Sequence, residues 1–222
     1  MAPEPLRAVV FDLDGVLVAS EGLHHRAMER LLAPRALERQ DHDAIVGTTL
    51  RRTLEYVSER FRLEGPIETL MAAYSELVVE ELEAAPLEPL NGALELVATL
   101  RERRLPIAVA SQSQPAWIEA TLRGAGLDGA FNTVLSAVEV ERGKPAPDIY
   151  LEAARRLGVP PPACLAIEDS APGVASAHAA GMFVVQVRQS EWAAPPQPLA
   201  HVVIDSLREF DMGWLGGALD GA

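Results

Sequence analysis

Six short apolar runs, separated by stretches with helical periodicity, restrict the fold of this 222-residue chain more than any other feature of its sequence. The runs are too short for helices, rich in valine and isoleucine, and without clean polar alternation, so they predict strands buried on both faces. They lie at residues 8–11, 107–110, 133–135, 164–167, 183–187 and 202–204, with helical patterns between them at 93–104, 115–124, 148–157 and 173–180. Strands that alternate with helices predict an α/β fold, in which a doubly wound parallel sheet carries helices on both faces.

One connection in this pattern is far too long. The first strand ends near Asp12 and the second begins near Pro106, a gap of roughly ninety residues where a crossover between parallel strands needs about a dozen. The excess contains helical patterns at 23–32, 50–61 and 67–82 and no convincing strand. We therefore expect residues 16–88 to form an all-helical domain inserted into an α/β core of residues 1–15 and 89–222. Ligands bind beyond the carboxyl ends of strands in open α/β sheets, so the insert is expected to cover that site.

Composition narrows the class of protein. The formal net charge is -13, which disfavours binding to nucleic acid or to an anionic membrane surface. A single cysteine, Cys164, excludes an intramolecular disulfide framework and fits a reducing cytosol. Residues 1–5 lack the basic start of a signal peptide, and no apolar run approaches the length of a membrane span. We expect a soluble, cytoplasmic protein with a loosely ordered tail at 213–222; its oligomeric state stays open, with a monomer favoured.

Two carboxylates follow the first predicted strand. Asp12 and Asp14 are two residues apart, so in extended backbone their side chains face the same side, about 6.6 Å apart. They are close enough to share a divalent cation while one of them acts as a nucleophile. Burying both without a partner would be costly, so a positive group is expected nearby. The alternative is a strand followed by an ordinary turn at Asp14-Gly15, and the hexapeptide alone does not separate these two interpretations.

Polar side chains also follow the second predicted strand and precede a later helix. Ser111 ends the second strand, where a hydroxyl beside backbone N–H groups suits a phosphate oxygen. Its alternative role, the N-cap of the helix from Pro115, is better filled by Ser113 or by the neighbourhood of Gln114. Lys144 stands between a glycine and a proline, where its ammonium could neutralise a phosphate or hold a nucleophile ionised. Taken alone, however, a lysine is more often a solvated surface residue.

The fourth predicted strand ends in two adjacent acids, Glu168 and Asp169. They could complete the oxygen ligand shell that Mg²⁺ prefers, or Asp169 or Ser170 could cap the following helix. All four sets of polar residues fall at the carboxyl ends of strands, which meet in one crevice of a parallel sheet. Together they supply a carboxylate nucleophile, a second acid, a hydroxyl, a lysine and a pair of metal ligands. That inventory predicts phosphoryl transfer through an aspartyl-phosphate.

These motifs, in this order, resemble those of the haloacid dehalogenase-like (HAD) hydrolase superfamily, in its subgroup of β-phosphoglucomutase-like phosphatases with a helical cap. The four motifs correspond to residues 11–17, 110–111, 143–148 and 167–170. The resemblance implies a Rossmann-like core and a cap at residues 16–88. It implies that Asp12 attacks phosphorus and Asp14 acts as general acid and base. It also implies that Ser111 and Lys144 bind the transferring phosphoryl group.

The same resemblance implies a metal site and a set of substrate contacts. Mg²⁺ would be held by Asp12, by Asp14 through its backbone carbonyl, and by Asp169, with Glu168 assisting. The residues implied to contact phosphate or substrate are Leu13, Gln112 and Ser113 in the core and His24, Gly47, Thr49 and Arg51 in the cap.

The cap departs from the mutase pattern. Val46 and Leu50 stand where a mutase carries the lysine and arginine that bind the distal phosphate of its sugar, and Gln114-Pro115 replaces a Lys-Asn pair. A mutase must bind a bisphosphate, so these changes favour a phosphatase. The sequence therefore predicts a Mg²⁺-dependent phosphatase of a small phosphorylated metabolite, with a sugar phosphate favoured. A β-phosphoglucomutase-type phosphotransferase is the first alternative, and a catalytically weak binding or regulatory protein with the same fold is the second.

Overall fold

The computed structural model describes residues 5–45, 48–85, 87–190 and 193–216. Its core is one six-stranded sheet in the order β3-β2-β1-β4-β5-β6, with every neighbouring pair parallel. The strands are β1 (Ala8–Phe11), β2 (Ile107–Ser111), β3 (Thr133–Ser136), β4 (Cys164–Glu168), β5 (Phe183–Val187) and β6 (Val202–Ile204). All six strands were predicted from the apolar runs.

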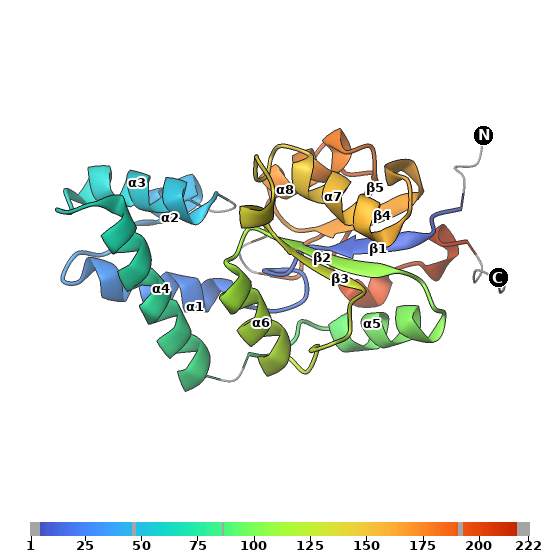
Figure 1. Cartoon of the computed structure of the whole chain (residues 1–222), viewed down its shortest axis with the longest axis horizontal. Helices are drawn as coiled ribbons and strands as arrows, with labels where there is room; N and C mark the ends of the chain where they lie inside the picture. The colour runs from blue at the N-terminus through green and yellow to red at the C-terminus, as the bar shows by residue number, and fades with distance from the viewer. Residues whose placement is uncertain (1–4, 46–47, 86, 191–192, 217–222) are drawn as a thin grey trace.

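Helices cover both faces of this sheet. On one side lie α5 (Ala93–Glu102) and α6 (Pro115–Gly124), and on the other lie α7 (Asp148–Leu157) and α8 (Ala171–Ala179), as Figure 1 shows. Successive side chains of β1 alternate between two core clusters: Val9 and Phe11 pack with α5 and α6, whereas Ala8 and Val10 pack with α7 and α8. This alternation explains why the central strand is apolar at every position. The predicted doubly wound α/β fold is confirmed.

The long connection after β1 forms a separate layer of four helices, at the end of the sheet toward which β1 runs (Figure 1). They are α1 (Glu21–Leu32), α2 (Arg39–Ile45), α3 (Leu50–Phe61) and α4 (Ile67–Ala84), and they share their own hydrophobic cluster. Three of these helices were predicted, and α2 was not. The inserted all-helical cap of the predicted fold class is therefore confirmed. No helix in the described part of the chain has both the length and the apolarity needed to cross a membrane.

A tight turn leads from β1 into the cap. Gly15 has a φ of 79°, a backbone conformation that favours glycine, and its N–H donates to the carbonyl of Val18 at 2.9 Å. Val18 also forms an isolated antiparallel bridge with Pro89, so the segments that enter and leave the cap lie side by side. The turn interpretation of Asp14-Gly15 is thus correct, and it places the carboxylate of Asp14 at the junction of cap and core.

The C-terminal segment is more ordered than expected as far as it is described. Residues Met212–Trp214 form a 3₁₀ turn, and Leu215 is buried in the core. Leu215 bridges Leu6 in parallel, and the N–H of Gly216 donates to the Leu6 carbonyl at 2.9 Å. The expected loose tail is therefore wrong for residues 213–216, because an apolar side chain and a backbone pairing fix them to the core. Residues 217–222 lie outside the described part.

Candidate active site

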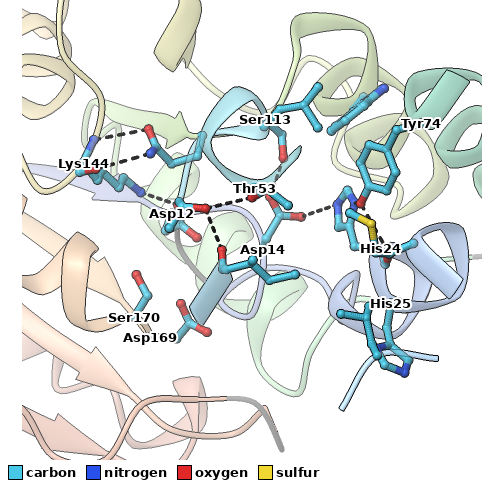
Figure 2. A pocket seen from close by; sticks show the side chains of 17 residues that line it. Asp12, Asp14, His24, His25, Thr53, Tyr74, Ser113, Lys144, Asp169 and Ser170 are labelled. Atoms are coloured by element: carbon cyan, nitrogen blue, oxygen red, sulfur yellow. Dashed lines mark hydrogen bonds and ion pairs between the residues drawn. The ribbon is translucent and has the colours of Figure 1, made fainter. Parts of the chain in front are cut away.

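The polar residues that follow the strands meet at one cavity of about 200 Å³ between core and cap (Figure 2). From the core it is lined by Asp12, Asp14, Gln112, Ser113, Trp117, Lys144, Asp169 and Ser170. From the cap it is lined by His24, His25, Met28, Leu37, Ile45, Thr48, Leu50, Thr53 and Tyr74. The prediction that the strand ends converge in one crevice beneath the cap is confirmed.

The sequence contains a single lysine, Lys144, and the structure buries it in this cavity with 6% of its surface exposed. Its Nζ donates to Asp12 Oδ1 at 2.5 Å, to Glu168 Oε1 at 2.6 Å and to the carbonyl of Ala110 at 2.9 Å. Burial opposes the charged form, but the two carboxylates outweigh it and raise the pKa of Lys144. The interpretation of Lys144 as a solvated surface residue is wrong.

Glu168 is fully buried, and both of its carboxylate oxygens accept hydrogen bonds. Oε1 accepts from Lys144 and from the hydroxyl of Tyr150 at 2.6 Å. Oε2 accepts from the N–H of Asp169 at 3.2 Å and from the N–H and hydroxyl of Ser170 at 3.4 and 3.1 Å. A side chain at Gly173 would place its Cβ about 2.0 Å from this carboxylate. The glycine in the first turn of α8 therefore leaves the space that Glu168 occupies.

The buried charges do not balance. Oxygens of Asp12, Glu168 and Asp169 lie within 4.8 Å of one another, and Lys144 supplies one positive charge among them. Burial raises the pKa of Asp12, opposed by Lys144 and reinforced by Glu168 and Asp14. A further positive charge beside Asp12 would favour its ionised form. The hard oxygen donors of this cluster fit a small divalent cation such as Mg²⁺.

The carboxylate of Asp14 is held by hydroxyl groups from both sides of the cavity. Its Oδ2 accepts from Ser113 at 2.9 Å and from Ser111 at 3.3 Å, and its Oδ1 accepts from Ser20. The His24 Nε2 atom lies 4.0 Å from the same Oδ1. Asp14 thus lies between core and cap and lines the cavity.

The capping alternatives have different outcomes. Helix α6 begins after Gln114 without a side-chain cap, and Ser113 binds Asp14 instead of the helix. Ser111 is fully buried; its hydroxyl accepts from the N–H of Ser113 at 3.0 Å and donates to Oδ2 of Asp14 at 3.3 Å. Ser170, in contrast, does cap α8, since its Oγ accepts from the N–H of Gly173 at 3.1 Å.

Gln112 contacts the backbone of Lys144 with both atoms of its amide. Its Oε1 accepts from the Lys144 N–H at 3.3 Å, and its Nε2 donates to the Lys144 carbonyl at 3.5 Å. The residue also lines the cavity, as expected of a substrate contact. It therefore connects the loop after β2 to the loop that carries the lysine.

Of the cap residues that the resemblance implied, His24 lines the cavity. Its Nδ1 lies 3.1 Å from the hydroxyl of Tyr74, and its ring centroid lies 5.5 Å from that of Trp117. Burial lowers the pKa of His24, with Asp14 opposing, so the imidazole is held neutral. Figure 2 shows His24 and Tyr74 on the cap side, facing Asp14.

Three further predicted contacts, Leu13, Thr49 and Arg51, are not among the residues that line the cavity. Leu13 is buried in the core cluster, and the Thr49 hydroxyl caps α3 by accepting from the N–H of Arg52. Arg51 donates to Glu68 at 3.2 Å on the exposed face of the cap. Gly47 lies outside the described residues. The substrate roles implied for these four residues stay predictions.

Sequence reasoning missed several residues of the site, among them Ser20, Tyr74, Trp117 and Tyr150. Ser20 stands just before α1, where a serine normally reads as an N-cap, yet it makes no capping bond and binds Asp14. The three aromatic residues lie at apolar positions of their helices and look like ordinary core. The only sequence signal for Tyr74 and Tyr150 was that each is a tyrosine at a buried helix position. A buried tyrosine hydroxyl usually has a hydrogen-bond partner, which indicates a polar group nearby.

Comparison with known proteins agrees with this geometry. The family model of haloacid dehalogenase-like hydrolases matches residues 6–181. The chain is 32% identical to hexitol phosphatase B of Escherichia coli (strain K12) over 216 residues, which cover 93% of this chain and 95% of the relative. This match spans both core and cap.

Solved structures share the whole architecture. The structure of CbbY from Rhodobacter sphaeroides in complex with phosphate superposes with a TM-score of 0.83 at 25% identity, covering 95% of this chain and 99% of that one. A β-phosphoglucomutase from Clostridium difficile shares the fold with a TM-score of 0.81 at 23% identity, covering 94% of this chain and 95% of that one. With four motifs converging under a helical cap, the chain belongs to the haloacid dehalogenase-like hydrolase family.

Proposed function

We propose that this protein is a Mg²⁺-dependent phosphatase that hydrolyses a small phosphorylated metabolite through an aspartyl-phosphate. The observation that carries the proposal is that two neighbouring carboxylates, Asp12 and Asp14, have different surroundings. Asp12 is buried against Lys144, whereas Asp14 is held by serine hydroxyls at the edge of the cavity. One acid is placed to act as a nucleophile and the other to exchange protons with a leaving group.

The chain's own residues account for both halves of the reaction. A carboxylate oxygen of Asp12 forms a bond to phosphorus while the bond to the leaving alcohol breaks, and Asp14 gives that alcohol its proton. Asp14 then takes a proton from water, which attacks phosphorus and breaks the bond to Asp12. Lys144 and Ser113 line the cavity beside Asp12 and would bind the phosphoryl oxygens. Ser111 donates to Asp14 Oδ2 at 3.3 Å, and the phosphoryl contact that the resemblance implied for it stays a prediction.

The metal would be held by Asp12, Asp169 and the backbone carbonyl of Asp14, and when bound it would offset negative charge on the phosphoryl group. Glu168 would assist indirectly, because its oxygens already accept from Lys144, Tyr150, Asp169 and Ser170. The substrate class is supported by the likeness to hexitol phosphatase B, which favours a sugar phosphate or a related polyol phosphate.

The test is phosphate release from a panel of phosphate monoesters with and without Mg²⁺, together with mass spectrometry of the acid-quenched enzyme. We expect turnover that requires Mg²⁺ and a phosphoryl adduct on the peptide containing Asp12. Asp12→Asn should lose the adduct and turnover together. Asp14→Asn should lose turnover yet bind Mg²⁺ nearly as tightly as the parent, since only its backbone carbonyl would ligate the metal.

The alternatives give different results in the same experiments. A β-phosphoglucomutase would convert β-glucose 1-phosphate to glucose 6-phosphate with a bisphosphate primer and release little free phosphate. A binding or regulatory protein would turn over none of the esters, aryl phosphates included. Either outcome would overturn the proposed phosphatase.

A further inference from the structure

The two sides of the cavity differ in chemistry. Opposite the carboxylates and Lys144 stands an apolar surface, here called the cap wall, formed by Met28, Leu37, Ile45, Leu50, Tyr74 and Trp117. The first five come from the cap, and Trp117 comes from α6 but packs in the cap's hydrophobic cluster. A leaving group that extends from a phosphoryl group at Asp12 must contact this surface.

The cap wall offers no cation to a substrate. Among the described residues that line the cavity, Lys144 is the only lysine or arginine, and it belongs to the core side. Four arginines of the cap pair with acids elsewhere: Arg26 and Arg30 with Glu81, Arg51 with Glu68, and Arg60 with Asp41. A second phosphate or a carboxylate on the leaving group would be buried there without a counter-ion, which is strongly unfavourable.

The polar groups beside the cap wall have partners within the cap, and the Nε2 atom of His25 lies 3.5 Å from Oε1 of Glu29. The Thr48 hydroxyl donates to the carbonyl of Ile45 at 2.8 Å and lies 2.8 Å from the hydroxyl of Thr53. The Nδ1 atom of His24 is engaged with Tyr74. A leaving group with many hydroxyls would give up hydrogen bonds to water and find few replacements, and such losses discriminate strongly between substrates.

We infer that the substrate is a monophosphate ester of an alcohol with an apolar, weakly hydroxylated carbon skeleton and no second charge. This inference rests on the proposed phosphatase activity, and it replaces the sugar or polyol phosphate favoured by the likeness to hexitol phosphatase B with the phosphate ester of a less hydroxylated alcohol. Each buried methylene group contributes several-fold to selectivity, so a ring-sized apolar skeleton gains roughly tenfold or more over its hydroxylated counterpart.

The decisive comparison uses substrates with the same shape. Cyclohexylmethyl phosphate and glucose 6-phosphate both carry a primary phosphate ester on a six-membered ring, but only the sugar carries ring hydroxyls. We expect kcat/KM for cyclohexylmethyl phosphate to exceed that for glucose 6-phosphate by about tenfold or more, and glucose 1,6-bisphosphate to be the poorest of the three. Equal or better turnover of glucose 6-phosphate or of the bisphosphate would overturn the inference.

A variant of the cap wall tests the cause. Leu50→Lys places a cation in the wall, and we expect it to lower kcat/KM for cyclohexylmethyl phosphate at least fivefold and to raise it for the bisphosphate by a similar factor. Leu94→Lys, at an exposed leucine of α5 remote from the cap, is the matched control and should change neither value. Identical effects of the two substitutions would overturn the assignment of selectivity to the wall.

Failure of the inference is distinguishable from failure of the proposed function. p-Nitrophenyl phosphate reports general phosphatase activity. If it and all three ring esters resist hydrolysis in Mg²⁺, the proposed function fails and this inference fails with it. If p-nitrophenyl phosphate is hydrolysed but the sugar esters are preferred over the cyclohexyl ester, the phosphatase stands and the apolar substrate class alone is wrong.

Discussion

The core side of the cavity is lined mainly by buried charged groups, whereas the cap side is lined mainly by apolar side chains. The core side buries charge: Lys144, Asp12 and Glu168 are almost inaccessible and satisfy one another at 2.5 to 2.6 Å. The cap side presents apolar side chains to the cavity, and its ion pairs lie elsewhere in the cap, as at Arg51 and Glu68. On the proposed function, charge that acts on phosphorus needs a fixed, water-poor position, whereas a surface that selects the leaving group can change without disturbing that position. The two sides would then divide the work, with catalysis on the core side and substrate selectivity on the cap side.

The largest expected effect is on the core side. Lys144→Met removes the cation and leaves Asp12 and Glu168 buried without a counter-ion, so we expect the free energy of unfolding to fall by about 3 kcal/mol. The phosphoryl group also loses a donor, so kcat should fall about 10³-fold. Denaturant unfolding and phosphate release at saturating ester measure the two effects.

A double variant separates the two effects of this lysine. Lys144→Met with Glu168→Gln removes one of the uncompensated charges, so it should recover part of the lost stability while kcat stays low. Unfolding of Lys144→Met at the same denaturant concentration as the parent would contradict the view that paired charge stabilises the core side.

The next effect concerns the contact between the two sides. Trp117 is 6% exposed and packs its ring 5.5 Å from His24 and 5.7 Å from Tyr74. Trp117→Ala should cost about 3 kcal/mol in stability and raise KM more than it lowers kcat, because the cap wall loses its link to α6. Ile118→Ala is the matched control, since Ile118 is equally buried but packs in the core cluster. A similar rise in KM for both variants would show that general destabilisation is the cause.

The same contrast explains what the sequence could predict. The core side was predictable because each of its motifs is a local pattern at a strand end or, for Lys144, in the loop between β3 and α7, and the parallel sheet brings these segments together. The cap wall was not, because Met28, Leu50 and Tyr74 come from three helices whose relative positions depend on tertiary packing. The sequence RQDHDAI of α2 lacks apolar periodicity, so this helix was missed as well.

Site residues were also missed where a side chain has two possible roles. Ser20 has the sequence position of an N-cap but binds Asp14 across the cap–core junction. The hydroxyl of Tyr150 binds the buried Glu168, and nothing local to its helix indicates that partner. The role of such a residue in the site can be assigned only when its hydrogen-bond partner, which is distant in sequence, is known.

A smaller effect comes from an ion pair within the cap. Asp41 accepts from the N–H of Glu38, from Tyr56 and from Arg60 at 3.1, 2.9 and 3.0 Å. Burial would raise the pKa of Asp41, but these donors outweigh it and hold the pKa below its usual value. Because the pKa of Asp41 is lower in the folded than in the unfolded protein, its carboxylate stabilises the folded state at any pH above its pKa in the unfolded protein. This stabilisation is lost as the pH falls from that value through the pKa of Asp41 in the folded protein.

Asp41→Asn should therefore destabilise the protein by about 1 kcal/mol at pH 7. The difference from the parent should stay constant down to about pH 5 and shrink below about pH 4, as the parent's carboxylate becomes protonated. Unfolding curves across this range measure it. A difference that grows toward acid pH would have the wrong sign for a stabilising carboxylate.

The smallest expected effect is the most direct test of the cap side. Arg51 is half exposed and pairs with Glu68, and exposed pairs contribute less than about 1 kcal/mol. Arg51→Ala should therefore change stability by less than about 0.5 kcal/mol and kcat/KM for monophosphates by less than about twofold. Arg62→Ala, at another exposed arginine of the cap, serves as the control. If Arg51→Ala alone abolished turnover of a bisphosphate, Arg51 would reach the cavity during catalysis, and the cap would supply the cation that a mutase needs.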